Sequence, residues 1–278
     1  MKNKVTIGII GGTGGMGQFF KRLFEQNNCK VLIASRSTEL SVEDCVSQSD
    51  VVVITVPIKS TVDVIKKIGP LVKEESLLID LTSIKIAPVE AMLNHSKCEV
   101  IGTHPVFGPG VGSIKGQSIV LCPARGKKWL PWLKDLLDKN GAKIKVATPE
   151  KHDKMMAVIQ GLVHFSTITV SHALKEMEID IKDSLDYASP IYKLRLDMLG
   201  RILNQDPELY ADIEILNPEV KNAIKAYLDS SEKLLKTIVK KDREGFINYF
   251  KESADYLGDF KKEAEKESDY LIEKMVKK

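Results

Sequence analysis

The chain has 278 residues, 43% of them hydrophobic and 28% charged, which is enough for two globular domains of ordinary size. Its 41 basic and 38 acidic residues leave a net charge of only +3, so a nucleic-acid partner is not indicated. The N-terminal apolar run is too short for a signal peptide or a membrane span, and the four cysteines lack CxxC and metal-ligand spacing. We therefore expect a cytoplasmic protein with reduced cysteines, no membrane contact and no metal.

Short apolar runs alternate with helix-like segments through the first half of the chain. Seven strands are predicted, at residues 5–10, 30–35, 50–57, 76–83, 98–105, 118–124 and 142–148. Strands that alternate with helices at this spacing are typical of a parallel sheet with helices on both faces.

The pattern changes at Thr148, where a threonine followed by proline predicts a helix start. Ser189 and Asn217 also precede prolines and predict two further starts, and we expect no strand after this point. The sequence therefore predicts an α/β domain at residues 1–149 and an all-α domain at residues 150–278.

The helical half carries more apolar stripes than a thin domain can cover. One stripe consists of Ile224, Tyr227, Leu228, Leu235 and Ile238. We expect a homodimer through this domain, unless the stripes bury only against one another; gel filtration distinguishes the two.

A glycine cluster, GGTGGMG, follows the first predicted strand and precedes a helix. Gly12, Gly14 and Gly17 fit the GxGxxG pattern of dinucleotide-binding turns. In that pattern Gly12 allows the tight turn, Gly14 lets the backbone approach a pyrophosphate, and Gly17 allows close packing of helix and strand. We predict a Rossmann-type dinucleotide-binding domain, although a glycine turn without a ligand remains the alternative. Its phosphate site comprises Gly12, Thr13, Gly14, Gly15, Met16 and Gly17.

The end of the second strand bears on the choice of cofactor. An NAD site usually has an acidic residue there for the ribose 2′-hydroxyl. This chain instead has Ser35, Arg36 and Ser37, which suit a 2′-phosphate and favour NADP over NAD, unless Arg36 is only a solvent-facing charge. Val56 and Pro57, at the end of the third strand, are assigned to the same cofactor site.

The stretch GTHPVFGPGVGS, residues 102–113, places one histidine among two prolines and four glycines. His104 and Ser83 both stand at the ends of predicted strands, and ligands bind outside the carboxyl ends of strands in open α/β sheets. A histidine near a nicotinamide can accept the proton of a hydroxyl whose carbon gives up hydride. Alternatively, His104 only caps local backbone.

Four stretches carry a resemblance to the prephenate dehydrogenase family of tyrosine biosynthesis. They are LIDLTSIK (78–85), GTHPVFGPGVGS (102–113), PEKHDKMMAVIQGLVHF (149–165) and ASPIYKLRLDMLGRILNQDPELYADI (188–213). They span nearly the whole chain, which resembles the dehydrogenase portion alone. One departure is Val106, where the family usually has methionine.

The resemblance implies a reaction and a role for each matching residue. Prephenate would lose hydride from C4 to NADP or NAD and CO2 from C1, giving 4-hydroxyphenylpyruvate. His104 matches the catalytic histidine at the ring hydroxyl, and Ser83 matches a serine near it and the nicotinamide. Arg201 matches the arginine that binds a substrate carboxylate, and His164 becomes a candidate for the substrate pocket. His152 resembles a group that supports the site rather than one that contacts substrate.

Other interpretations stay open from the residues alone. Arogenate dehydrogenase, or a cyclohexadienyl dehydrogenase that takes both substrates, would use the same mechanism. A β-hydroxyacid dehydrogenase or imine reductase would need a catalytic lysine, for which Lys154 is the nearby candidate. A bidentate role for Arg201 competes with a surface pair to Asp197, and a role for Lys193 is doubtful. A non-catalytic NADP-binding sensor would have no need of His104 as a base.

Overall fold

The computed structural model describes residues 4–277 and divides into two compact units. The first runs to Ile159 and includes Glu208–Glu219, and the second comprises Gln160–Pro207 and the chain from Val220 onward. A domain boundary after residue 149 stays a prediction.

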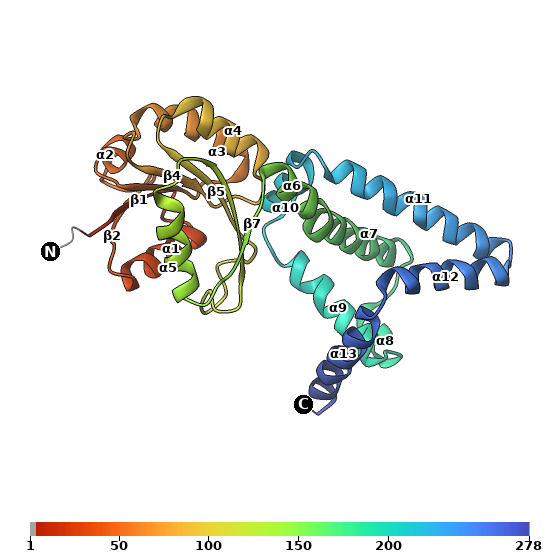
Figure 1. Cartoon of the computed structure of the whole chain (residues 1–278). Helices are drawn as coiled ribbons and strands as arrows, with labels where there is room; N and C mark the ends of the chain where they lie inside the picture. Colours follow the sequence, from red (N-terminus) through yellow and green to blue (C-terminus); the bar gives the residue numbers. More distant parts are fainter. Residues whose placement is uncertain (1–3, 278) are drawn as a thin grey trace. The chain divides into compact units, whose positions relative to one another are not determined.

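One mixed sheet forms the centre of the first unit (Figure 1). Its strands are β1 (Thr6–Ile10), β2 (Lys30–Ala34), β3 (Val51–Ile54), β4 (Leu77–Asp80), β5 (Glu99–Pro105), β6 (Ser118–Arg125) and β7 (Lys143–Val146), in the order β2-β1-β3-β4-β5-β6-β7. Strands β1 to β5 are parallel, whereas β6 pairs antiparallel with β5 and parallel with β7. The Rossmann-type fold is therefore confirmed, but a wholly parallel sheet was the wrong expectation.

The reason for the reversal lies in the connection between β5 and β6. A parallel connection needs a crossover of a dozen or more residues, usually a helix. Residues 106–117 contain no helix, so the chain returns beside β5 in the antiparallel direction.

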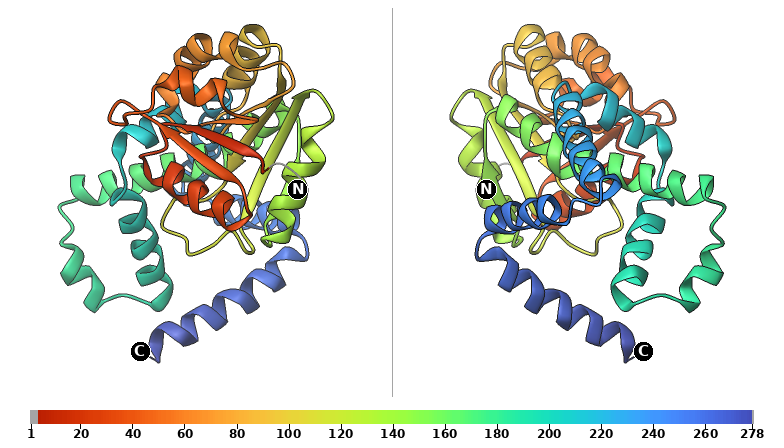
Figure 2. Two further views of the ribbon diagram at one scale, coloured as in Figure 1. Left: turned by 90° about the vertical axis from the view of Figure 1, so that its left-hand side faces the viewer. Right: turned by 90° about the vertical axis from the view of Figure 1, so that its right-hand side faces the viewer.

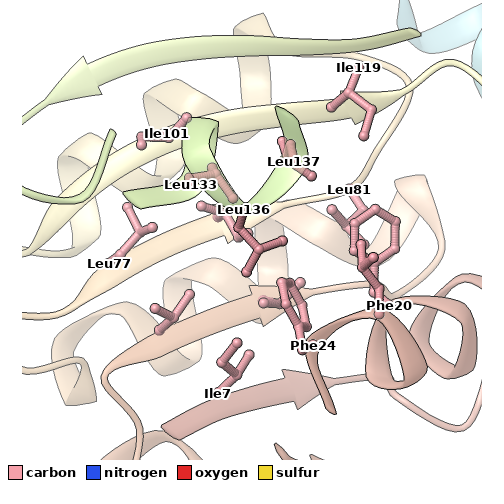
Figure 3. Packing of buried hydrophobic residues seen from close by; sticks show 14 of the residues in the cluster. Ile7, Phe20, Phe24, Leu77, Leu81, Ile101, Ile119, Leu133, Leu136 and Leu137 are labelled. Atoms are coloured by element: carbon pink, nitrogen blue, oxygen red, sulfur yellow. The ribbon is translucent and has the colours of Figure 1, made fainter. Parts of the chain in front are cut away.

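Helices cover both faces of the sheet (Figures 1 and 2). They are α1 (Gly15–Gln26), α2 (Val42–Ser47), α3 (Ile58–Ile68), α4 (Ile86–His95) and α5 (Trp129–Lys139), with a 3₁₀ turn at Gly69–Leu71. On one face Phe20 and Phe24 of α1 pack with Leu133 and Leu137 of α5 (Figure 3). A second core on the other face joins α2, α3 and α4. Strands β1, β3, β4 and β5 therefore contribute buried residues to both faces, which explains the continuous apolar runs of β3 and β4.

A continuous helical stretch, Pro149–Glu176, runs from the first unit into the second, and the chain crosses between the units again at 207/208 and 219/220. The stretch consists of α6 (Pro149–Met156), a π-helical turn (Ala157–Leu162) and α7 (Val163–Glu176). Thr148 caps it as predicted, because its hydroxyl accepts a hydrogen bond from the Lys151 amide at 3.2 Å. By length and composition this stretch could cross a membrane, which is weak evidence by itself.

The described residues of the second unit form helices joined by short turns and loops, with no strand. Its further helices are α8 (Ile181–Asp186), α9 (Pro190–Leu203), α11 (Val220–Val239), α12 (Arg243–Leu257) and α13 (Phe260–Val276). Ser189 caps α9 as predicted, accepting from the Tyr192 amide. The remaining helix, α10 (Pro207–Leu216), belongs almost entirely to the first unit, where Asp212 accepts from the Lys59 amide at 3.1 Å.

Candidate active site

The glycine turn between β1 and α1 is tightly packed. The residue with positive φ is Gly11, at 81°, and not Gly12, to which the sequence assigned the tight turn. A Cβ on Gly12 would lie 2.8 Å from the Ile33 side chain, and a Cβ on Gly17 would lie 2.6 Å from the Gly12 Cα. At Gly12 and Gly17 the pattern therefore marks positions where a side chain does not fit, but the turn's left-handed residue, Gly11, precedes the pattern.

The same turn has the features of a phosphate site. A Cβ on Gly14 would meet only the Gly11 carbonyl at an ordinary 3.5 Å, so the backbone there is open to approach. The first amide groups of any helix lack intrahelical acceptors, and Gly14, the N-cap of α1, has no side chain that could accept from them. Amides at a helix N-terminus bind anionic groups, so these residues fit a dinucleotide pyrophosphate.

Two other predicted cofactor segments lie at the same carboxyl edge of the sheet. Arg36 is exposed in the turn after β2, between Ser35 and Ser37, whose hydroxyls are 3.1 Å apart. Val56 follows β3 and would touch a Cβ placed on Gly11, and Pro57 is the N-cap of α3. The fold thus brings these segments to one edge, as the topology of parallel strands requires.

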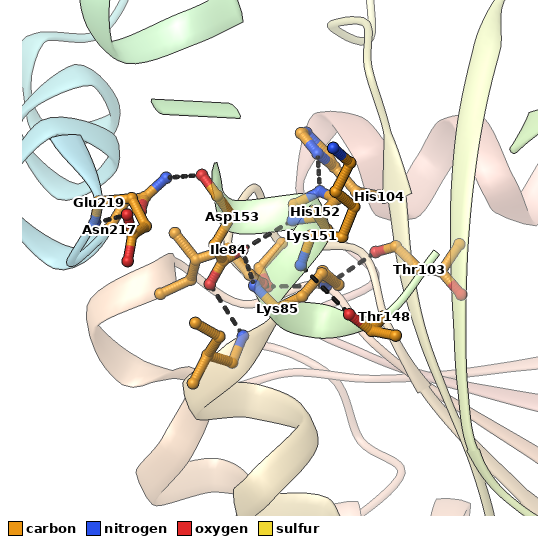
Figure 4. A network of polar contacts seen from close by, with 12 residues as sticks. Ile84, Lys85, Thr103, His104, Thr148, Lys151, His152, Asp153, Asn217 and Glu219 are labelled. Atoms are coloured by element: carbon orange, nitrogen blue, oxygen red, sulfur yellow. Dashed lines mark hydrogen bonds and ion pairs between the residues drawn. The ribbon is translucent and has the colours of Figure 1, made fainter. Parts of the chain in front are cut away.

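His104 is the penultimate residue of β5 and is buried, with only 2% of its surface exposed. Its Nδ1 lies 2.8 Å from Nε2 of His152 on α6, and the two rings meet edge to face (Figure 4). His152 Nδ1 in turn lies 2.7 Å from Oδ1 of the buried Asp153. Three residues therefore form one hydrogen-bonded chain inside the first unit.

Asp153 also fixes where α4 begins. Its Oδ1 accepts from the Lys85 amide at 2.7 Å, and its Oδ2 accepts from the Ile86 amide at 2.9 Å (Figure 4). Its own carbonyl accepts from the Asn217 side chain at 2.9 Å. Asp153 is therefore an N-terminal cap supplied by another helix, which binds α4 to α6.

A second buried pair stands at the end of β4. The Lys85 ammonium contacts the Asp80 carboxylate and donates to the Thr103 carbonyl at 3.0 Å, and both charged side chains are fully buried. Asp80 also accepts from the Thr82 amide at 3.0 Å. These bonds define the turn that carries Ser83, which is itself partly exposed.

Burial lowers the pKa of His104 well below its ordinary value of 6.5, and the neighbouring His152 and Lys85 add to the effect. Desolvation disfavours the charged imidazolium, so the folded protein holds His104 neutral. A neutral imidazole is the form that can accept a proton.

The loop after His104 reaches the glycine turn. Phe107 packs edge to face on Phe19 of α1, with ring centroids 5.6 Å apart. A Cβ on Gly15 would lie 2.9 Å from the Pro109 ring. The stiff loop therefore packs on the helix whose N-terminus is the candidate phosphate site, and His104 and that candidate site belong to the same unit.

The predicted substrate residues Arg201 and His164 belong to the second unit. Arg201 is exposed near the end of α9, and His164 is buried on α7. Asp197 pairs with Lys193 and not with Arg201, so the surface pair considered as the alternative for Arg201 does not form. Lys193, for which a substrate-binding role was doubtful, forms an ion pair with Asp197 on the surface of the same helix.

Sequence reasoning missed three buried residues of the network, Asp80, Lys85 and Asp153. Asp80 and Lys85 both lie in the stretch LIDLTSIK, on either side of Ser83, and Asp153 directly follows His152. Buried charges are rare, so a charge among apolar neighbours is the signal that could have found Asp80 and Lys85, whereas Asp153 lies in the polar stretch PEKHDKMM and has no such signal. All four cysteines are free thiols, as expected, and burial raises the pKa of Cys45 to about 11 and that of Cys122 to about 12.

A glycine turn on a mostly parallel sheet, joined to a helical unit, is the arrangement of two-domain nucleotide-binding oxidoreductases. Residues 24–146 match the family model of the prephenate dehydrogenase nucleotide-binding domain, and residues 148–252 match that of the prephenate dehydrogenase dimerization domain. The first match includes Ser83 and His104 but begins after the glycine turn. This chain belongs to the prephenate dehydrogenase family.

Relatives and a solved structure agree with the family. A probable arogenate/prephenate dehydrogenase of Methanocaldococcus jannaschii is 40% identical over 93% of this chain, and the T-protein of Haemophilus influenzae is 35% identical over 95%. The chain spans 62% and 70% of the lengths of these two relatives. The crystal structure of prephenate dehydrogenase from A. aeolicus with hydroxyphenyl propionate and NAD+ is 22% identical, with a TM-score of 0.74 over 91% of this chain and 97% of that one. At that identity the likeness concerns the fold.

The buried neutral histidine predicts a pH-dependent stability. Below about pH 6.5 the unfolded chain takes up a proton on His104 that the folded state does not, so the free energy of unfolding falls as pH falls. From pH 6.5 to 5, wild type should lose up to about 1.4 kcal/mol per pH unit more than His104→Gln. Urea unfolding at several pH values measures this, and the exposed His172→Gln serves as control. Parallel profiles for wild type and His104→Gln would contradict the neutral, buried state.

Proposed function

We propose that the chain catalyses the oxidative decarboxylation of prephenate to 4-hydroxyphenylpyruvate in tyrosine biosynthesis. The observation that carries the proposal is the buried neutral His104, hydrogen-bonded to His152 and carried by a loop that packs on the phosphate-binding helix. A non-catalytic sensor would gain nothing from a histidine prepared in this way, because binding a dinucleotide needs no base.

His104 has a proton-transfer role in this proposal. A bound nicotinamide supplies the acceptor for the hydride that leaves C4 of the substrate. His104 accepts the proton of the C4 hydroxyl, and the proton returns to the same oxygen when loss of CO2 makes the ring aromatic. Such a positioned base contributes roughly 10²–10⁴-fold to the rate. Ser83, on the adjacent turn after β4, is proposed to orient His104 and the nicotinamide.

Binding of substrate is assigned to the second unit. Arg201 is proposed to bind a substrate carboxylate, since a guanidinium can form two parallel hydrogen bonds with that group. His164 is proposed to line the substrate pocket. The π-helical turn before it supports this, because such turns occur often at functional sites.

NADP is the proposed cofactor, with NAD as the alternative. The supporting observation is the exposed Arg36 between two serines at the end of β2, where an NAD site usually has an acid. The phosphate contacts are assigned to residues 12–17, with Val56 and Pro57 along the neighbouring β3 turn.

Arogenate is the second candidate substrate. It differs from prephenate by an ammonium group in place of the side-chain keto group, which leaves the ring chemistry unchanged. The Methanocaldococcus relative is named a probable arogenate/prephenate dehydrogenase, and this name supports arogenate as a candidate substrate.

We also propose a homodimer in the cytoplasm. Leu228, Leu235 and Ile238 of α11 are each at least half exposed and recur at helical spacing, and an exposed group of apolar side chains is typical of an interaction surface. The matching family model is described as a dimerization domain. Sedimentation velocity should show a species of twice the 31.0 kDa chain mass, and a monomer at micromolar concentration would contradict the proposal.

The function is tested by absorbance at 340 nm with prephenate or arogenate and either cofactor. We expect turnover of prephenate with NADP. Turnover with NAD alone would overturn the role of Arg36, and turnover of arogenate alone would change the substrate. No turnover with any of the four pairs would refute the proposed reaction and favour the sensor or a different hydroxyacid substrate.

Two substitutions separate the base from the carboxylate site. His104→Asn should lower kcat by roughly 10²–10⁴-fold while KM for prephenate stays similar, because it removes the base and little binding. Arg201→Gln should raise KM by at least about 10-fold, because a charge-assisted pair is lost. Steady-state kinetics measure both, with Lys193→Gln as the control on the same helix. Normal turnover by His104→Asn would exclude the assigned base.

A further inference from the structure

The two ring nitrogens of His104 are not equivalent. Nδ1 is bonded to His152, whereas Nε2 has no hydrogen-bond partner among residues 4–277. In a neutral imidazole one nitrogen carries the proton and the other a lone pair. Which nitrogen of His104 can act as a base therefore depends on the group that faces Nδ1.

The hydrogen-bonded chain behind His104 decides this question. An Asp153 carboxylate only accepts hydrogen bonds, so His152 Nδ1 carries the proton in their 2.7 Å contact. His152 then presents a lone pair on Nε2. The 2.8 Å contact with His104 consequently needs a proton on His104 Nδ1, which leaves the lone pair on Nε2.

We propose that Asp153 and His152 are positioning residues that hold His104 in the tautomer whose Nε2 is the base. This proposal rests on the proposed function for its substrate. The bond between the C4 hydroxyl oxygen and its proton breaks as a bond between Nε2 and that proton forms. The proton later returns from Nε2 to the oxygen of the aromatic product, so none is gained or lost overall.

The same chain accounts for the charge that His104 gains during turnover. The groups facing it are His152 and, through His152, Asp153 from α6, and Lys85 with its partner Asp80 from the β4–α4 turn. Lys85 opposes a positive imidazole, and its own charge is balanced by Asp80. The Asp153 carboxylate, acting through His152, therefore stabilises the imidazolium, as the aspartate does in a Ser-His-Asp triad.

A purely structural role for Asp153 is the competing explanation. Its bonds to the amides of Lys85 and Ile86 cap α4 and would exist without any catalytic histidine. Capping does not, however, require the buried bond between His152 and His104, which is the contact that sets the tautomer.

Nitrogen-15 NMR of the histidine rings tests the proposal directly on the wild-type protein. The spectrum distinguishes a protonated ring nitrogen from one with a lone pair, and comparison with His104→Gln identifies the His104 signals. We expect His104 protonated on Nδ1 at neutral pH. A proton on Nε2 would overturn the proposal.

A pair of variants at His152 tests the consequence for catalysis. His152→Phe removes the acceptor, so His104 should populate both tautomers and kcat should fall by roughly 10²-fold with KM nearly unchanged. His152→Gln should recover part of the loss, because its amide oxygen can accept from His104 Nδ1. The control His172→Gln should keep both kcat and the His104 signals. Wild-type kcat in His152→Phe, or an unchanged His104 tautomer in it, would contradict the proposal.

The outcomes separate this proposal from the proposed function. Absence of turnover in wild type would refute the function, whatever the tautomer. Turnover with the proton on Nε2 of His104 would refute the positioning role alone. If His152→Phe does not fold, the wild-type spectrum and the kinetics of His152→Gln still decide.

Discussion

The hydrogen bonds of the Asp153 carboxylate hold together the candidate site of the first unit. This carboxylate binds two amides at the start of α4, 67 and 68 residues earlier in the chain, and it binds His152 on its own helix. Through His152 it reaches His104 on β5. A single acidic side chain therefore sets the relative positions of α4, α6 and the end of β5.

Burial makes this network rigid. A buried polar group without a partner costs roughly 1–3 kcal/mol, so each member is held where its partner is. The fully buried pair of Asp80 and Lys85 follows the same logic. Buried ion pairs add little net stability compared with apolar residues of similar volume, and we interpret this one as fixing the turn that carries Ser83.

The packing of the His104 loop explains its composition. Phe107 binds the loop to α1 through Phe19, and Pro109 lies against Gly15 at the helix N-terminus. Prolines limit the backbone freedom of such a loop, and a side chain on Gly15 would displace it. The loop that follows the histidine and the candidate phosphate-binding turn therefore pack directly against each other.

The sequence by itself determined the features that depend on neighbouring residues. The strand and helix alternation, the caps at Thr148 and Ser189, and the glycine turn are local patterns, and the structure contains all of them. His104 could be singled out because its loop is unusual in composition, and the family because four motifs occur in order.

Only the tertiary structure decided which distant groups meet. The antiparallel return of β6, the place of α10 in the first unit, and the roles of Asp153 and Lys85 all depend on contacts between residues far apart in the chain. No local propensity records such contacts, because each residue is an ordinary charged or polar one until the fold buries it. The sequence could thus predict that His104 is functional, but only the folded structure shows that its Nδ1 is hydrogen-bonded to His152.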